Sequence, residues 1–148
     1  MSKQLIEAYG PGTKDGLYPT KDQWEKLLRF PHTGTLVTTQ FAKFRDSFFE
    51  KATQDAAAAY STVTARLAPE LGVETLYEGM YGSVLYGSDD EDWDFIGMLR
   101  FPNREVFLKF FLHPDYLAVH GARDLMMKKY RMLISYPPFQ HPPAWSKR

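Results

Sequence analysis

The stretch from residue 93 to residue 136 constrains the fold of this chain more than any other part of the sequence. It starts with an apolar run over 93–101 that has the pattern of a β-strand and is broken by a Pro-Asn pair. Asn103 is a suitable N-cap for the helical pattern that follows over 104–129, which we expect to break at Pro114. A second strand pattern over 131–136 is ended by two prolines. Strand, helix and strand in this order make half of a split β-α-β unit.

The other half of this unit lies upstream. Residues 35–45 are rich in β-branched and aromatic side chains and alternate loosely, which predicts a strand. Apolar residues then recur every three or four positions over 48–71, which predicts a long helix. Residues 73–86 predict a strand with a glycine bulge, and the acidic run 87–92 predicts a hairpin loop because it lacks the spacing of an EF-hand. The predicted fold is therefore α+β: a ferredoxin-like βαββαβ unit whose four-stranded antiparallel sheet carries both long helices on one face.

The remaining segments extend this core, 35–136, into one predicted domain. Residues 1–19 contain several glycines and prolines and predict an arm, and 20–30 predict an extra N-terminal helix with Thr20 as its N-cap. Residues 137–148 form a Pro-rich C-terminal tail, which we expect to extend across a neighbouring subunit. The sheet face without helices needs a cover, so we expect a homodimer that pairs two sheet faces.

Composition excludes several classes of function. The formal net charge is zero, with 18 basic and 18 acidic residues, which argues against nucleic acid as a partner. The sequence contains no cysteine, which excludes disulfides and thiolate sites. No apolar run approaches the roughly 20 residues of a membrane span, and the N-terminus lacks the apolar core of a secretory signal. We therefore expect a cytoplasmic protein with no membrane partner.

Several phrases of the sequence resemble one known family. They are LLRFPHTGTLVTTQFAKFR, LYEGMYGSVLYG, WDFIGMLRFPNREVFLKFFLHPDY and HGARDLMM. In this order, over about residues 20–137, the chain resembles the longer members of the DUF1330 family, which belongs to the dimeric α/β-barrel (ferredoxin-like) superfamily. The resemblance implies a βαββαβ protomer that forms dimers through its sheets. Those members typically have Asn where this chain has Gln40, which implies a changed pocket.

The wider superfamily implies more about activity. It includes polyketide cyclases, muconolactone isomerases, quinol-forming monooxygenases and haem-using enzymes, and most cofactor-free members hold substrate in an apolar cavity between sheet and helices. The stretch KFFLHPDYLAV is similar to the cyclase helix that carries a catalytic Tyr and His around an H-P pair. His113 and Pro114 match this pattern, but Phe110 and Tyr116 stand where the catalytic tyrosine and histidine would be. The cyclase mechanism therefore does not transfer to this chain.

Three residues of the second helix are the predicted catalytic group. Tyr116, His120 and Arg123 are spaced i, i+4 and i+7 and so share one face of a helix. Histidine moves protons near neutral pH, a guanidinium holds a carboxylate or enolate, and a tyrosine hydroxyl donates to a carbonyl oxygen. The structural alternative pairs Arg123 with Asp124 or with a carboxylate of the sheet, and uses His120 to cap a backbone carbonyl.

Six further residues are candidates for substrate binding: Gln40, Glu78, Tyr81, Asp94, Phe110 and His113. Each has a structural alternative. Gln40 in mid-strand is also typical of a buried amide that has found a partner. Glu78 is either a general base or half of a salt bridge at a strand edge. Asp94 alternates with Arg100 and is placed to pair with it, and His113, before a proline, is typical of a turn or surface residue.

We therefore predict a cofactor-independent enzyme that uses acid–base proton transfer on a small apolar carbonyl, aromatic or polyketide-like substrate. The reaction would be a cyclisation, an isomerisation or a lyase-type elimination. No metal-ligand spacing or phosphate-binding loop is evident, and nothing singles out an axial histidine for haem. Two alternatives stay open: a non-catalytic ligand-binding or structural dimer, and a cofactor-free monooxygenase acting on a quinol.

Overall fold

The computed structural model describes residues 1–137, so all but the first residue of the predicted tail lies outside the described residues. The elements, in chain order, are α1 (Ser2–Tyr9), α2 (Lys21–Arg29), β1 (Leu36–Phe44), the 3-10 turn η1 (Asp46–Phe49), α3 (Lys51–Glu70), β2 (Glu74–Met80), β3 (Phe95–Phe101), α4 (Arg104–Phe111), α5 (Pro114–Val119), α6 (Ala122–Met126) and β4 (Met127–Ser135). None of the helices in this range is long and apolar enough to cross a membrane.

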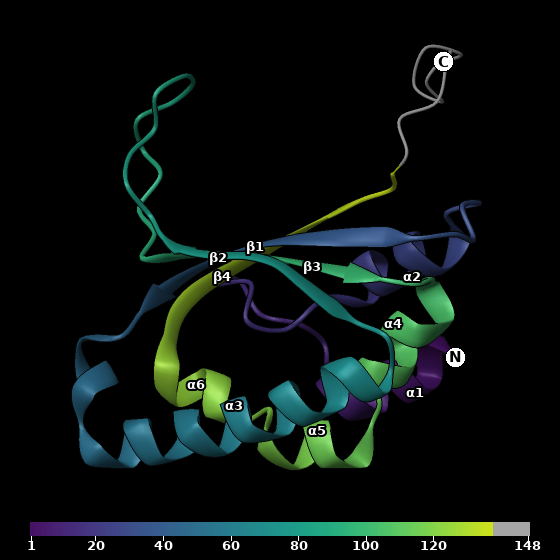
Figure 1. Cartoon of the computed structure of the whole chain (residues 1–148), viewed down its shortest axis with the longest axis horizontal. Coiled ribbons are helices and arrows are strands. Elements are labelled where there is room, and N and C mark those ends of the chain that lie inside the picture. The colour runs from purple at the N-terminus through teal and green to yellow at the C-terminus, as the bar shows by residue number, and fades with distance from the viewer. Residues whose placement is uncertain (138–148) are drawn as a thin grey trace.

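The strands form one antiparallel sheet in the order β2-β3-β1-β4. Helices α3 and α4 to α6 all lie on one side of this sheet, which we call the inner face (Figure 1). This arrangement is the ferredoxin-like βαββαβ fold, and it confirms the predicted fold class. Strand periodicity places Thr38 and Gln40 on the inner face and Thr39 and Phe41 on the opposite, outer face.

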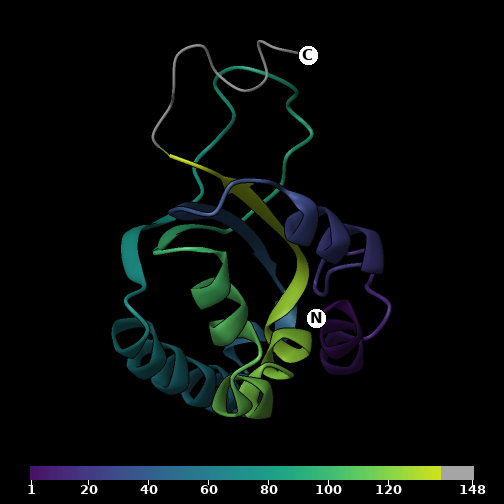
Figure 2. The ribbon, with the colours of Figure 1, turned by 90° about the vertical axis from the view of Figure 1, so that its right-hand side faces the viewer.

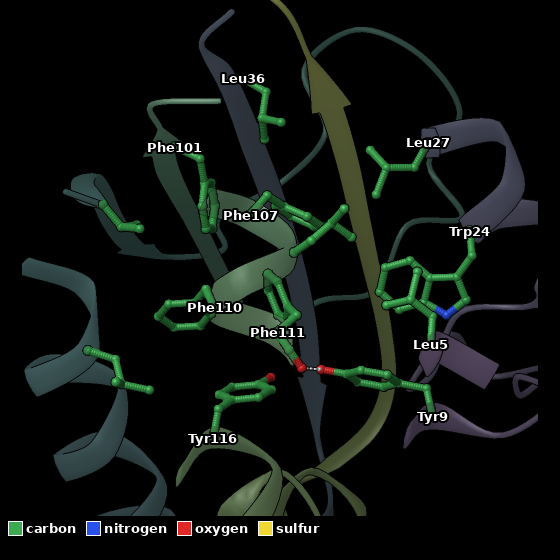
Figure 3. Packing of buried hydrophobic residues seen from close by; sticks show 13 residues of the cluster. Leu5, Tyr9, Trp24, Leu27, Leu36, Phe101, Phe107, Phe110, Phe111 and Tyr116 are labelled. Atoms are coloured by element: carbon green, nitrogen blue, oxygen red, sulfur yellow. Dashed lines mark hydrogen bonds between the residues drawn. The ribbon is translucent and has the colours of Figure 1, made fainter. Parts of the chain in front are cut away.

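The inner face is packed with aromatic side chains (Figure 3). Phe101 of β3 has no exposed surface, and its ring contacts three phenylalanines of α4 at centroid distances from 4.9 to 6.1 Å. Those three are Phe107, Phe110 and Phe111. Tyr116 of α5 is 1% exposed and packs on the same group. This core fixes the positions of α4 and α5 under the sheet.

The prediction that residues 1–19 form an arm is wrong for their first half, because α1 forms there. The glycines and prolines that indicated an arm all lie after Tyr9. Leu5 and Tyr9, four residues apart on one face of α1, are buried in the core, and this burial stabilises a helix that is otherwise too short to persist alone. The end of α1 coincides with Gly10, whose φ is +73°.

The predicted extra helix is confirmed as α2, with Thr20 as its N-cap in a capping box with Gln23. We call residues 2–29, which comprise α1, α2 and their connection, the N-terminal layer; it lies beside the edge strand β4 (Figure 2). The Tyr130 N–H donates to the Asp15 carbonyl at 2.9 Å, and the next residue, Gly16, has a φ of +77°. A Cβ at Gly16 would collide with the Tyr130 carbonyl oxygen, so only glycine fits this contact.

The long helix starts later than predicted, at Lys51, because η1 precedes it. This shift leaves Phe49 outside the long helix, and its side chain is 85% exposed. Phe48 packs instead, with its ring stacked on Phe44 of β1 at 4.3 Å between centroids. The beginning of α3 is therefore set by this contact rather than by helical periodicity.

Two other predicted boundaries are also corrected. The predicted strand over 73–86 is shorter, and its irregularity lies between Thr75 and Tyr77 rather than at the glycines. The break predicted at Pro114 is confirmed, because α4 ends before it and α5 begins there. A second, unpredicted break separates α5 from α6, and the helical segment ends at Met126 rather than at 129. Strand β4 starts at Met127, where pairing with β1 overrides the helical pattern.

Within residues 1–137, no helix covers the outer face of the sheet (Figure 1). Two of its large side chains, Tyr77 and Leu133, are 53% and 51% exposed. The connection between β2 and β3 projects from this side (Figure 1). It carries Leu85 and Tyr86, which are almost fully exposed. The outer face therefore presents apolar surface that the described chain leaves open.

Candidate functional site

A cavity of about 770 Å³ lies between the N-terminal layer and β4. Its inner end is lined by four aromatic residues and one arginine: Tyr9, Phe111, Tyr116, Tyr130 and Arg123. From there it follows β4 towards Tyr136, with α2 on the opposite side. The N-terminal layer, which lies outside the βαββαβ unit, therefore supplies one wall of this cavity.

Arg123 of α6 is the charged group at the inner end of the cavity. It is 6% exposed, its Nε donates to the Leu17 carbonyl at 3.3 Å, and its guanidinium carbon lies 4.1 Å from the centre of the Tyr130 ring. The structural alternative of an Arg123–Asp124 pair is wrong, because the Asp124 carboxylate instead accepts from the Tyr18 hydroxyl at 2.9 Å. Among the described residues Arg123 makes no ion pair at all.

The electrostatic state of Arg123 follows from burial and from the tyrosines around it. Burial acts to lower the pKa of the guanidinium, but Tyr130, Tyr116 and Tyr60 act to raise it, and the pKa ends above its usual value. Arg123 is therefore always protonated. A buried positive charge without a carboxylate is costly, and an anion bound in the cavity would offset that cost.

Two tyrosines of the inner end, Tyr9 and Tyr116, keep their protons because burial raises the pKa of each. The hydroxyls of Tyr60 and Tyr116 lie 3.3 Å apart, and burial raises the pKa of Tyr116 well above its usual value. The Tyr9 hydroxyl donates to the Phe111 carbonyl at 2.5 Å, and burial also raises the pKa of Tyr9 (Figure 3). Protonated hydroxyls beside a guanidinium stabilise negative charge on an oxygen atom.

His120 lies behind this group. Its Nδ1 is 2.8 Å from the Leu117 carbonyl oxygen, which can only accept, so Nδ1 carries the proton and Nε2 of the neutral ring is free to accept one. The expected capping of a backbone carbonyl is thus confirmed. The ring packs against Tyr9 and Tyr18, with centroids 5.3 and 5.6 Å away. Of the predicted catalytic group, Tyr116 and Arg123 line the described cavity and His120 does not.

Three of the predicted substrate-binding residues lie away from the cavity, two on the sheet and one on the connection between β2 and β3. Gln40 donates to the Thr38 hydroxyl at 3.0 Å, which confirms the interpretation as a partnered amide. Glu78 is exposed on β2, and the predicted salt bridge is wrong because Glu78 makes no ion pair within residues 1–137. The Tyr81 hydroxyl lies 3.5 Å from the Glu91 carbonyl oxygen, on the connection between β2 and β3.

Asp94 is part of a polar cluster at the start of β3. It accepts from the backbone N–H of Phe44 at 2.8 Å and from Lys43 at 3.3 Å. The predicted pair between Asp94 and Arg100 is wrong, because Arg100 donates to Glu74 at 2.9 Å. Asp94 therefore connects the end of β1 to the start of β3, which is a structural role.

Phe110 and His113 lie on either side of the α4–α5 turn. Phe110 is 3% exposed within the aromatic core. His113 is the N-cap of α5, with Nδ1 accepting from the Asp115 N–H at 3.1 Å, in agreement with the interpretation as a turn residue. None of the six predicted substrate-binding residues lines the described cavity.

Sequence reasoning missed two tyrosines of the inner end, Tyr9 and Tyr130, and also Tyr60, whose hydroxyl lies 3.3 Å from that of Tyr116. Tyr60 lies on the apolar face of the predicted long helix. Its hydroxyl is the one polar group on that face, and this is the signal that could have identified it. Tyr130 lies between the predicted helix, which ends at 129, and the predicted strand, which begins at 131, whereas the structure places it inside β4. Tyr9 lies in the segment that was predicted to be an arm. These residues come together only through tertiary contacts.

Comparison with known proteins supports the fold and no activity. No protein-family model matches the chain, and no characterised relative matches it in sequence. A protein of unknown function from Rhodopseudomonas palustris matches with a TM-score of 0.71 and 20% identity over 82% of this chain and 96% of that one. Its methylated form matches with the same score and identity over 86% and 96%. A hydroxynitrile lyase from Passiflora edulis matches with a TM-score of 0.51 and 16% identity over 72% and 96%.

Proposed function

We propose that the protein binds and converts a small apolar carbonyl compound whose anionic oxygen is held by Arg123. The observation that carries this proposal is a buried guanidinium that lines a cavity and has no carboxylate partner in the described chain. A carboxylate or enolate would supply the missing negative charge. Tyr116, which keeps its proton, would donate a hydrogen bond to the same oxygen.

The proposed reaction is proton transfer without a cofactor: a cyclisation, an isomerisation or a lyase-type elimination. His120 would accept the proton at Nε2, since its Nδ1 is engaged by the Leu117 carbonyl. The elimination class gains some support from the hydroxynitrile lyase that shares the fold. The wall of tyrosine rings must then open enough for the substrate to reach His120.

A second candidate is a ligand-binding protein without catalysis. The observation that favours it is the position of His120 outside the cavity wall, packed among tyrosine rings. We also infer that the protein is a homodimer joined through the outer faces of its sheets, because that face is apolar and uncovered in the described chain. Membership of the DUF1330 family and a cytoplasmic location remain predictions from the sequence.

Binding of cinnamate and of its methyl ester, measured by titration calorimetry, tests the role of Arg123. We expect the carboxylate to bind more tightly than the ester, and Arg123→Met to remove this preference by weakening carboxylate binding by about 100-fold, on the scale of losing a buried charge-assisted contact. Arg100→Met, on the outer face, is the matched control. Equal binding of acid and ester, or unchanged binding in Arg123→Met, would contradict the proposal.

The role of His120 is tested once a converted compound has been found. His120→Ala should lower the rate about 10²–10⁴-fold, while cinnamate affinity stays within about twofold of the parent value. An unchanged rate removes His120 from the mechanism, and a protein that binds carboxylates but converts no carbonyl compound is the ligand-binding candidate.

A further inference from the structure

The outward edge of β4 has unused backbone hydrogen-bonding groups. β4 pairs with β1 on one side, and on its other side the Tyr130 N–H donates to the Asp15 carbonyl. In an antiparallel strand the N–H and C=O of one residue point to the same side, and the side alternates from residue to residue. The backbone groups of Met132 and Ile134 therefore also point away from β1, towards α2.

These groups face the outer part of the cavity, which we call the β4 groove. On one side it is lined by Met132 and Ile134, and on the other by Lys26 and Leu27 of α2. Its far end is closed by Phe30, which follows α2 and stacks on Tyr136 with ring centroids 4.4 Å apart. Leu27 points from α2 towards β4 (Figure 3). Within residues 1–137, no backbone hydrogen bond reaches Met132 or Ile134 from this side. The N-terminal layer thus makes one strand-like hydrogen bond to β4, at Tyr130. The outward backbone groups of Met132 and Ile134 receive no such bond from it.

The charge around the groove is positive. The cationic side chains that line the cavity outside Arg123 are Lys14, Lys26, Lys129 and Arg131. Asp15 is the single acid among the described lining residues, and its carboxylate already accepts from the Leu17 N–H at 3.2 Å. Arg131 is paired with Glu91 at 3.0 Å, whereas Lys14 and Lys26 make no ion pair within the part of the chain that is described. The groove therefore favours an acidic occupant.

We propose that the β4 groove binds an extended acidic peptide segment of another protein, which adds to the sheet as a fifth strand beside β4. A peptide offers alternating N–H and C=O groups to Met132 and Ile134. An alkyl or aryl chain in the same place would bury those backbone groups without partners, at a cost that a peptide avoids.

The register of an added strand defines the sequence that fits. Side chains on its inner face would lie beside Met132 and Ile134 and contact Leu27, so they should be apolar. Side chains on its outer face would lie beside Arg131 and Leu133, so the side chain beside Arg131 should be acidic. The fitting segment therefore alternates apolar residues with outer-face residues that include an acid.

Backbone N-methylation gives the sharpest test. The probe is a fluorescein-labelled hexapeptide, Glu-Val-Glu-Val-Glu-Val, with two matched versions: one N-methylated at its valines, the other at its glutamates. Only one of these two sets of N–H groups can face β4. Fluorescence anisotropy should show binding of the parent peptide, a loss of about tenfold or more for one methylated version, and a change within about twofold for the other.

Charge reversal is the second test. Lys26→Glu should weaken binding of the parent peptide about three- to tenfold, as expected for reversing an exposed charge. Lys109→Glu makes the same charge change on α4, outside the groove, and should leave binding unchanged. The proposed ligand of Arg123 plays no part in either test, so the two proposals stand or fall separately.

Several outcomes would overturn the peptide proposal. No binding of the parent peptide at millimolar concentration is one. Equal loss for both methylated versions, or for neither, would exclude strand addition. Self-association of the free protein that Lys26→Glu abolishes would assign the groove to a second copy of this chain, and displacement of the peptide by cinnamate with equal loss in Arg123→Met would assign it to the small-molecule site.

Discussion

The two faces of the sheet have similar sequence patterns but different environments. On β3, Phe101 of the inner face is fully buried, whereas Met98 of the outer face is only partly buried. On β4, Met132 packs on the core cluster, whereas its neighbour Leu133 is 51% exposed. Both faces alternate with the same period of two, and the helices of the described chain cover only one of them. Periodicity thus shows which residues share a face, but it does not show what covers that face.

The largest expected effect compares one apolar residue on each face, Phe101 on the inner face and Met98 on the outer face. Phe101→Ala should lower the free energy of unfolding by about 3–5 kcal/mol, because it removes a ring from the packed core and leaves a cavity. Met98→Ala should cost less than about 1 kcal/mol in the monomer. Urea unfolding at low protein concentration measures both, and a large cost for Met98→Ala that disappears on dilution would show that a second copy covers the outer face.

The next effect concerns Tyr130, which lies on the inner face beneath Arg123. Burial raises its pKa from 10.0 to about 12, so its contribution to stability is complete below pH 10 and is lost as the pH rises through 12. A shift of this size corresponds to about 2–3 kcal/mol. Urea midpoints at pH 9 and pH 12 should therefore differ less in Tyr130→Phe than in the parent protein.

Tyr86→Phe, at an exposed position in the connection between β2 and β3, is the control for this measurement. Its hydroxyl is in contact with water in both states, so the loss of stability between the two pH values should equal that of the parent protein. Equal losses in all three proteins would show that Tyr130 is not protected by burial.

The smallest expected effect tests whether the outer face is an interface. Leu133→Asp places a charge on exposed apolar surface and should weaken the proposed homodimer about tenfold or more, or about 1.4 kcal/mol. Analytical ultracentrifugation measures the dissociation constant, and Lys109→Asp on α4 serves as a surface control. An unaffected dimer would move the interface to another surface, and a monomeric parent protein would rule out the homodimer.

The sequence predicted the fold because the fold depends on local patterns. Alternation in β1, helical spacing in α3, the Thr20 capping box and the Asn103 N-cap are all short-range features that the structure contains. The errors occur where a tertiary contact overrides such a pattern. Met127 fits a helix by its neighbours, but it pairs with Phe44 of β1 instead.

The candidate site was much less predictable than the fold. Tyr116 and Arg123 share a helical stripe and could be grouped from their spacing alone. Tyr9, Tyr60 and Tyr130 belong to α1, α3 and β4, and no local pattern connects them. The absence of a carboxylate near Arg123, among the described residues, was also invisible in the sequence, because Asp124 is its neighbour in the chain but binds Tyr18 in space.

The N-terminal layer contacts β4 at Gly16 and Tyr130, and this contact has no room for one additional carbon atom. Gly16→Ala adds one methyl group where the Tyr130 carbonyl already stands, and at a φ that alanine rarely adopts. The added methyl group meets the βαββαβ unit only at the backbone of Tyr130. This single substitution should therefore loosen the N-terminal layer, which forms one wall of the cavity. A strain that carries it would show what a cell loses when that wall is displaced.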